Sequence, residues 1–217
     1  MKFGILGTGV VGQAIGAKLV SLGHEVKMGG REAINAKAQD WTATAGPLAS
    51  YGTFKQAASF GEMVVNATAG GVSLLALQAA TADALAGKVL IDIANPLDFS
   101  QGMPPTLSVV NTDSLGEQIQ RAFPDTRVVK TLNTLSCKLM VNPRAVAAGD
   151  HNLFISGNDA SAKAQVLDVL AQFGWAKTSV VDLGDISTAR GTEQLLPIWI
   201  RLWGALGTDS FNFKIAR

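Results

Sequence analysis

The chain has 217 residues, of which 47% are hydrophobic and 16% charged, and its formal net charge is +1. This length and composition predict a globular protein with a substantial core and exclude a disordered chain. The near-neutral charge gives no electrostatic reason to expect nucleic acid or an anionic membrane surface as a partner.

Strand and helix patterns alternate from the first residue onward. Short apolar runs predict strands at 2–6, 24–28, 62–67, 88–93, 127–131, 152–156 and 179–182. Apolar residues at helical spacing predict helices at 10–22, 32–44, 73–86, 113–123, 160–173 and 187–206. This alternation is typical of an α/β fold, a doubly wound, mostly parallel Rossmann-type sheet with helices on both faces.

The chain divides into two parts in this interpretation. Residues 1–133 form a dinucleotide-binding core, and residues 134–217 continue the α/β fold and end in an apolar helix and a tail. The second part is too short for a large helical substrate domain. A relative of the β-hydroxyacid dehydrogenases is therefore disfavoured, because those enzymes carry their catalytic lysine on such a domain.

Cysteine content and hydropathy indicate the compartment. The single cysteine, Cys137, excludes an intrachain disulfide and a cysteine metal cluster, and it suits a reducing compartment. The apolar stretch 195–206 is too short to span a bilayer and contains Arg201. We read no signal peptide ahead of the first strand and expect a cytoplasmic protein with no membrane partner.

A glycine-rich loop joins the first predicted strand to the first predicted helix. Gly7, Gly9 and Gly12 form G-x-G-x-x-G in the context that the dinucleotide-binding fingerprint requires. Gly7 permits the tight turn, Gly9 lets the backbone approach a pyrophosphate, and Gly12 lets the helix pack on the strand. The helix N-terminus then favours the negative charge of the pyrophosphate.

The end of the second strand indicates which nicotinamide cofactor binds. An acidic residue there would hold a ribose 2′-hydroxyl and repel a 2′-phosphate, but this chain has Gly29, Gly30 and Arg31. The glycines leave space, and the Arg31 guanidinium can meet the adenine or the 2′-phosphate. The alternative is a solvated pair between Arg31 and Glu32. We favour NADP over NAD.

No proton-handling group stands out for the second substrate. An alcohol dehydrogenase needs a general acid or base, yet His24 lies far from the expected nicotinamide and His151 reads as a surface or turn residue. Lys130 and Lys138 flank "TLNTLSC" without a visible carboxylate partner. We assign no catalytic side chain and no metal ligand. A small-molecule acceptor that is itself a hydride carrier would need none.

Four segments together carry a resemblance to a known family. They are "GILGTGVVGQAIGAKLVSLGHEVKMGGRE", "IANPLDF", "VVKTLNTL" and "LLPIWIRLWGALGTDSFNFKIA". With these segments the chain resembles the coenzyme F420-dependent NADP oxidoreductases over nearly its whole length. The resemblance implies reversible hydride transfer between NADP(H) and the deazaflavin coenzyme F420.

The resemblance also implies which residues contact the two cofactors. Residues 8–11 (Thr8, Gly9, Val10, Val11) would hold the pyrophosphate, and Gly30, Arg31 and Asn35 the 2′-phosphate. Thr68, Val72 and residues around 95–98, including Asn95 and Pro96, would line the dinucleotide groove. Asn133 and Cys137 would lie near the nicotinamide, and Phe211 beside the deazaflavin.

Three positions depart from the family pattern. Archaeal members have serine, lysine and histidine where this chain has Gly30, Asn35 and Asn133. Similar Rossmann domains also reduce flavins, as in the cytosolic domain of metalloreductases. The alternatives are therefore an NADPH-dependent flavin (FMN or FAD) or metal reductase on the same scaffold, and a non-catalytic NADP-binding sensor.

The last predicted helix is apolar nearly all round, with Trp199 and Trp203 on one face. Core packing alone would explain this pattern. The family resemblance favours a homodimer interface that also walls the acceptor pocket.

Overall fold

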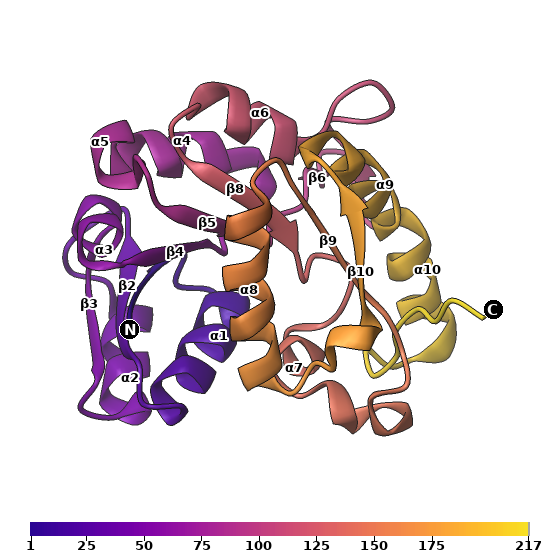
Figure 1. Cartoon of the computed structure of the whole chain (residues 1–217), viewed down its shortest axis with the longest axis horizontal. Helices are drawn as coiled ribbons and strands as arrows, with labels where there is room; N and C mark the ends of the chain where they lie inside the picture. The colour runs from indigo at the N-terminus through magenta and orange to yellow at the C-terminus, as the bar shows by residue number, and fades with distance from the viewer. Residues whose placement is uncertain (217) are drawn as a thin grey trace.

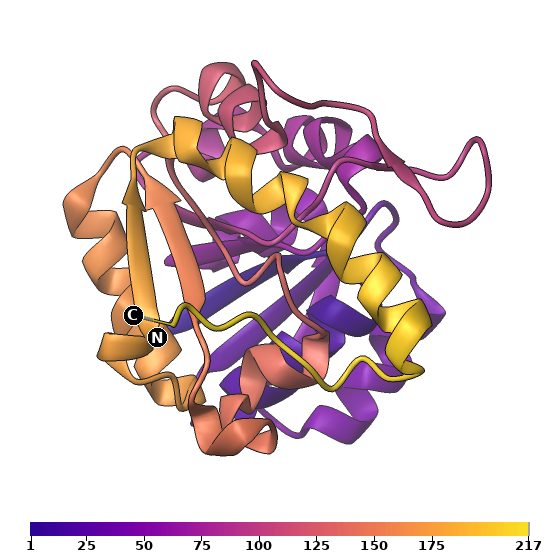
Figure 2. The same ribbon diagram turned by 90° about the vertical axis from the view of Figure 1, so that its right-hand side faces the viewer.

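The computed structural model describes residues 1–216, which form one doubly wound sheet with helices on both faces (Figure 1, Figure 2). The strand order is β10-β9-β8-β5-β4-β1-β2-β3, and the neighbouring strands are parallel except for β8 and β9. The strands are β1 (Lys2–Leu6), β2 (Glu25–Gly30), β3 (Ala49–Thr53), β4 (Met63–Asn66), β5 (Val89–Asp92), β8 (Arg127–Thr131), β9 (Leu153–Gly157) and β10 (Val180–Gly184). The predicted fold class, a mostly parallel Rossmann-type sheet, is confirmed.

Two helical layers cover the sheet and create two hydrophobic cores. The first layer comprises α1 (Val10–Ser21), α2 (Ala36–Ala45), α7 (Cys137–Val141) and α8 (Ala160–Phe173). The second comprises α3 (Phe54–Phe60), α4 (Gly70–Ala80), α5 (Ala82–Leu85), α6 (Leu115–Ala122) and α9 (Ala189–Gln194). The helix α10 (Leu196–Leu206) follows α9, and a short hairpin pairs β6 (Leu97–Asp98) with β7 (Thr106–Leu107).

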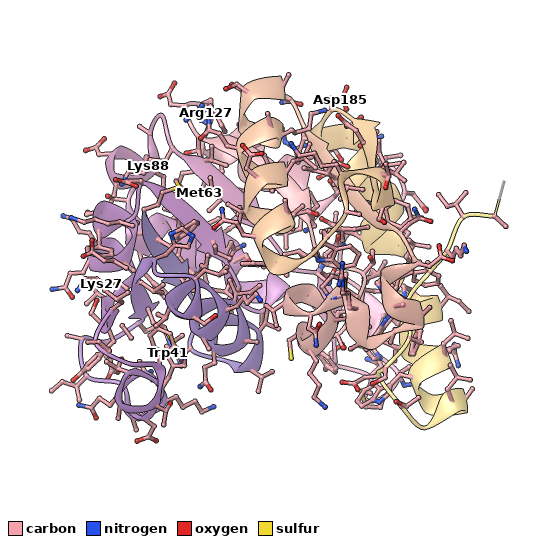
Figure 3. All side chains as sticks on the ribbon, turned by 60° about the horizontal axis from the view of Figure 1, so that its bottom comes forward. Lys27, Trp41, Met63, Lys88, Arg127 and Asp185 are labelled. Carbon is pink, nitrogen blue, oxygen red and sulfur yellow. The ribbon has the colours of Figure 1, made fainter. Side chains whose placement is uncertain are left out.

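The central strands are apolar on both sides because helices cover both faces. In β5, Leu90 contributes to one core and Ile91 to the other. Met63 of β4 is 1% exposed, and Figure 3 shows it within the sheet while Lys88, Arg127 and Asp185 extend at the periphery. Burial of both faces gives the continuous apolar runs from which these strands were predicted.

One predicted helix starts later than expected, and a strand and helix were missed. The helix predicted at 32–44 begins at Ala36, where the Asn35 side chain accepts a hydrogen bond from the Ala38 amide at 3.1 Å and caps it. Residues 49–60, left unassigned by the sequence pattern, form β3 and α3. The segment escaped prediction because β3 is an edge strand with only Gly52 fully buried.

Two of the long predicted helices are broken. The helix predicted at 73–86 divides into α4 and α5 at Thr81, whose φ of 73° lies outside the helical region. The helix predicted at 187–206 consists of a 3-10 turn, η4 (Ile186–Thr188), followed by α9 and α10. Pro197 lies at the start of α10, because it has no N–H to continue the hydrogen bonding of α9.

The chain after α10 turns back beside the molecule and is tied to β9 (Figure 2). The Asn152 amide donates to the Phe213 carbonyl at 2.9 Å, and the Ile215 amide donates to Asn152 Oδ1 at 2.7 Å. Next to it, His151 is only 4% exposed and bonds the Pro143 carbonyl and Asn212. The prediction of a surface position for His151 is wrong, because the tail covers this side chain.

The remaining elements are the 3-10 turns η1 (Pro143–Ala145), η2 (Ala147–Gly149) and η3 (Lys177–Ser179). Residues 102–105 lie in the loop between β6 and β7. Among the helices of residues 1–216, none is both long and apolar enough to cross a membrane.

Candidate functional site: a dinucleotide groove at the carboxyl edge of the sheet

The glycine loop is packed where glycine is required and open where a ligand would approach. Gly7 has a φ of 121°, and a Cβ there would lie 2.5 Å from the Ala67 carbonyl oxygen. A Cβ on Gly12 would lie 2.2 Å from the Gly7 carbonyl oxygen. A Cβ on Gly9, in contrast, would meet no atom within 4 Å. The space above Gly9 therefore matches the approach that a pyrophosphate needs.

The N-terminus of α1 presents free backbone donors to this space. Gly9 is the N-cap, and no side chain accepts a hydrogen bond from the first turn. Gln13 Nε2 donates to the Thr8 carbonyl at 3.0 Å and holds the loop against the helix. Uncapped amides and the helix dipole together favour a phosphate group, so the chemistry fits the predicted role of residues 8–11.

The residues predicted around the 2′-phosphate lie together at the end of β2. A Cβ on Gly30 would lie 3.3 Å from Asn35 Nδ2 and 3.6 Å from Thr8 Cγ2, and a Cβ on Gly29 would lie 2.8 Å from Ala57 Cβ. The expectation that these two glycines leave open space is therefore wrong, because the space beside them is filled by neighbouring residues. Arg31 is exposed, and within residues 1–216 no carboxylate lies within 4.0 Å of its guanidinium, Glu32 included. The alternative of an Arg31–Glu32 pair is therefore wrong for this structure, and the role of Arg31 in reading the phosphate stays a prediction.

A cavity of about 300 Å³ continues the groove along the carboxyl ends of β4 and β5. Three of the predicted groove residues, Thr68, Val72 and Asn95, line the cavity, and so does Val11, which was predicted to hold the pyrophosphate. The remaining lining residues are Ala67, Ala69, Gly70, Gly71, Ile93, Ala94, Leu97 and Phe99. Pro96 is buried next to them.

Hydrogen bonds fix Thr68 in the groove wall. Its hydroxyl donates to Asn66 Oδ1 at 2.7 Å and lies 2.8 Å from Ser73 Oγ. Asn66, at the end of β4, in turn donates from Nδ2 to Asp92 Oδ1 at 2.8 Å. The groove wall is thus connected to a buried polar network beneath it.

Two asparagines join the ends of β5 and β8. Asn95 Nδ2 donates to the Asn133 carbonyl at 2.8 Å, and Asn133 Nδ2 donates to Asn95 Oδ1 at 2.9 Å. Asn133 is 3% exposed and follows Leu132, whose φ is 62°. Asn133 therefore supports Asn95 at the groove, and its predicted proximity to the nicotinamide stays a prediction.

The last two predicted residues lie on separate elements. Cys137 is half-buried at the start of α7, which packs against α1. Phe211 is half-buried and stacks on Trp199 of α10, with ring centroids 5.3 Å apart. Their contacts with the two cofactors stay predictions.

Sequence reasoning missed a buried ionic cluster below the groove. Lys130 Nζ lies 2.8 Å from Asp92 Oδ2 and 2.8 Å from Glu193 Oε1, so the view that Lys130 has no carboxylate partner is wrong. Burial alone would lower the pKa of Lys130, but attraction by Asp92 and then Glu193 outweighs it and raises that pKa. A lysine in the middle of the apolar strand "RVVKT" was the available signal.

A second pair ties α9 to α6. Arg190 Nε donates to Glu117 Oε2 at 2.8 Å, and the arginine holds the pKa of Glu117 below its ordinary value. Helix α9 is therefore attached to the Rossmann core by Arg190 and Glu193 together.

Comparison with known proteins agrees with this geometry. Residues 2–96 match the family described as NADP oxidoreductase, coenzyme F420-dependent. A protein from Arthrobacter sp. FB24, provisionally described as an F420-dependent NADP-reductase, has a crystal structure that is 57% identical, covers 100% of both chains and superposes with a TM-score of 0.95.

Two other proteins are more distant. The metalloreductase STEAP3 of Rattus norvegicus is 30% identical over 203 residues, which are 91% of this chain but only 38% of that protein. A reductive aminase of Aspergillus terreus, solved with NADPH, is 20% identical, with a TM-score of 0.66 over 95% of this chain and 62% of that one. At this identity the aminase supports the fold alone.

The uncapped glycine loop and the match to the Arthrobacter protein over its full length agree. The chain belongs to the coenzyme F420-dependent NADP oxidoreductase family and is an NADP-dependent oxidoreductase.

Proposed function

We propose that this enzyme transfers a hydride between NADP(H) and coenzyme F420. NADPH supplies the hydride to the deazaflavin, and one proton from water completes the reduction. The family match and the 57% identical relative described as F420-dependent support this acceptor. The chain would bind and orient two flat rings and exclude water from between them.

The composition of the groove is the observation that carries the proposal. Among residues 1–216, no carboxylic acid, histidine, lysine, tyrosine or cysteine lines the cavity beside Thr68 and Asn95 or the cavity between the β6–β7 hairpin and α10, whose one ionisable group is the Arg201 guanidinium. Reduction of a carbonyl or an imine would require a positioned proton donor. Transfer between two hydride carriers requires only their orientation, which small apolar residues and the Asn95–Asn133 pair are suited to provide.

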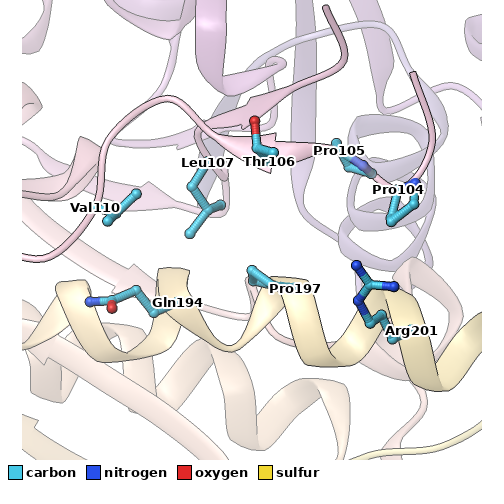
Figure 4. Close-up of a pocket in the computed structure, with 8 residues that line it drawn as sticks. All are labelled: Pro104, Pro105, Thr106, Leu107, Val110, Gln194, Pro197 and Arg201. Carbon is cyan, nitrogen blue, oxygen red and sulfur yellow. The ribbon is translucent and has the colours of Figure 1, made fainter. Parts of the chain in front are cut away.

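We infer that the acceptor binds in a second cavity. It has a volume of about 420 Å³ between the β6–β7 region and helices α9 and α10 (Figure 4). Its lining residues are Pro104, Pro105, Thr106, Leu107, Val110, Gln194, Pro197 and Arg201. Leu107 pairs in the hairpin with Leu97, which lines the nucleotide groove. The two cavities therefore share this hairpin, and a volume of this size suits a small-molecule ring system.

The proposal includes a homodimer formed through α10. Only Leu196 and Ile200 of this helix are buried, whereas Ile198, Trp203 and Leu206 are 47%, 45% and 56% exposed. Exposed apolar groups of this size on one helix are typical of a protein–protein interface. A second copy would cover them and complete the wall of the acceptor site.

A flavin or metal reductase is the second candidate. The match to the rat metalloreductase over 91% of this chain favours it, and Asn133 is the residue near the predicted ring site that departs from the family pattern. The same groove would then orient NADPH against FMN or FAD.

The deciding experiment is NADPH oxidation measured in separate reactions with F420, FMN and FAD. Rapid turnover with F420 alone supports the first proposal. Turnover with FMN or FAD alone supports the second candidate. Tight NADPH binding without turnover by any of the three would reject F420 and both flavins as acceptors.

A further inference from the structure

Lys130 occupies a position that the proposed reaction does not use. It lies on β8, its side chain is fully buried, and its ammonium donates to Asp92, to Glu193 and to the Ala94 carbonyl oxygen. An ammonium has three N–H donors, so every donor of Lys130 has a partner. Three fixed partners leave the group no rotational freedom.

Two of the three partners, Asp92 and Ala94, lie in or next to the wall of the nucleotide groove. Asp92 ends β5, and its Oδ1 accepts from Asn66 Nδ2 at 2.8 Å and from the Ala94 amide at 3.2 Å. Ala94 itself lines the groove beside Asn95, and Asn66 holds Thr68 on the opposite side. Lys130 therefore fixes the groove wall from below.

The third partner belongs to the acceptor side. Glu193 is in α9 immediately before Gln194, which lines the acceptor cavity. Its carboxylate also accepts from the Leu115 and Gly116 amides at 2.8 and 3.0 Å, at the N-terminus of α6. The charges in the cluster sum to −1, and the N-terminal amides of α6 offset the excess.

We propose that Lys130 is a positioning residue for hydride transfer, because its ammonium holds α9 and α10 at a fixed distance from the nucleotide groove. This inference rests on the proposed acceptor site between the β6–β7 hairpin and α10. A change in the groove wall at Ala94 moves the ammonium, and the ammonium moves Glu193 and the helices that follow it. Hydride transfer is sensitive to such displacement, since a shift of about 1 Å can slow an oriented reaction roughly a hundredfold.

The choice of variant follows from the charges. Lys130→Met alone leaves two buried carboxylates facing each other and endangers folding. The double variant Lys130→Met with Glu193→Gln removes one positive and one negative charge and keeps both side-chain volumes close to the original. Asp92 stays charged but keeps its hydrogen bonds from Asn66 Nδ2 and the Ala94 amide. Leu170→Ala in α8, on the other face of the sheet, is the matched control. It lowers the stability of the fold but leaves the contacts of Lys130 with Asp92 and Glu193 in place.

Two measurements test the inference in these proteins. In single turnovers with saturating NADPH and acceptor, we expect the double variant to transfer hydride at least roughly tenfold more slowly, with the Kd for NADPH changed less than about threefold. The Leu170→Ala control should keep its rate. A rate in the folded double variant within about twofold of the original enzyme would overturn the inference.

Hydrogen–deuterium exchange provides a readout that needs no acceptor. Binding of NADPH should slow amide exchange across 189–206 in the original protein and in Leu170→Ala, and leave it unchanged in the double variant. Equal protection in all three proteins, or none in the original, would overturn the inference. Failure of F420 and flavins to turn over would reject only the proposed acceptor, because the exchange result is independent of it.

Discussion

Gly9 provides the sharpest test of where the dinucleotide binds. The change Gly9→Val places a branched side chain in the space above the loop without altering the fold around it. Gly9 has φ −80° and ψ 179°, an extended conformation that valine adopts readily. Because no atom lies within 4 Å of the added Cβ, we expect the free energy of unfolding to stay within about 0.5 kcal/mol of the original value.

The expected loss of affinity is much larger. The valine would occupy the space in which a pyrophosphate meets the uncapped amides of α1. A hydrogen bond to a charged group contributes about 1.5–3 kcal/mol, so losing two of them costs at least about 3 kcal/mol. At 1.4 kcal/mol per factor of ten, the Kd rises by roughly 150-fold or more. NADPH and NADH should be affected equally, since both contain the pyrophosphate.

Isothermal titration with each cofactor and thermal unfolding of the free protein measure the two effects separately. Gly191→Val is the matched control, because a Cβ at Gly191 of α9 also meets no atom within 4 Å and lies outside the groove. It should leave both Kd values unchanged. Retained affinity in Gly9→Val, within about threefold, would show that the loop is not the pyrophosphate site.

Three further predictions concern charge and assembly. Arg31→Ala should weaken NADPH binding by about 1.5–2 kcal/mol, roughly ten- to thirtyfold, and NADH binding by less than about twofold; equal effects in titrations with both cofactors would exclude a role in reading the 2′-phosphate. Hydrogen bonds from Arg121 lower the pKa of Asp113 to about 2 from 3.8, so its stabilising effect is present above pH 4 and is lost as the pH falls toward 2. Because the pair is largely solvated, Asp113→Asn should lower the free energy of unfolding in urea by only about 0.5–1 kcal/mol at pH 7 and by less at pH 3; an equal loss at both values would contradict this cause. Trp203→Glu should raise the dimer Kd in sedimentation equilibrium by roughly thirtyfold, about 2 kcal/mol. An unchanged dimer Kd in this variant, or an original protein that is wholly monomeric, would exclude the α10 interface.

Local sequence patterns were sufficient for the parts of the fold that depend on neighbours in the chain. The parallel strands of the core are apolar because both faces are covered, and α8 has the predicted bounds Ala160–Phe173. The edge strand β3 lacks this pattern, because its residues are mostly half-buried. The break between α9 and α10 was missed although Pro197 marks it, since the apolar residues continue at helical spacing on both sides.

For the site, the tight turn at Gly7 and the close packing at Gly12 were predicted correctly, because both depend on backbone geometry within a few residues. The contact of the loop with a pyrophosphate stays a prediction. The grouping of Thr68, Val72 and Asn95 with Val11 in one cavity agrees with what the family resemblance implied. The support of Asn95 by Asn133 was not predictable, because it depends on β5 and β8 lying side by side.

By itself, the sequence determined a Rossmann-type fold and a glycine loop suited to a dinucleotide, since periodicity and glycine spacing act over short stretches of chain. It also placed Arg31 at the end of the second strand, where we predict that the 2′-phosphate is read. Only the tertiary structure decided the partners of Lys130 and the burial of His151. Those contacts join strands and helices far apart in the chain, and a buried charge or imidazole is satisfied by whichever groups the packing of the whole molecule brings to it.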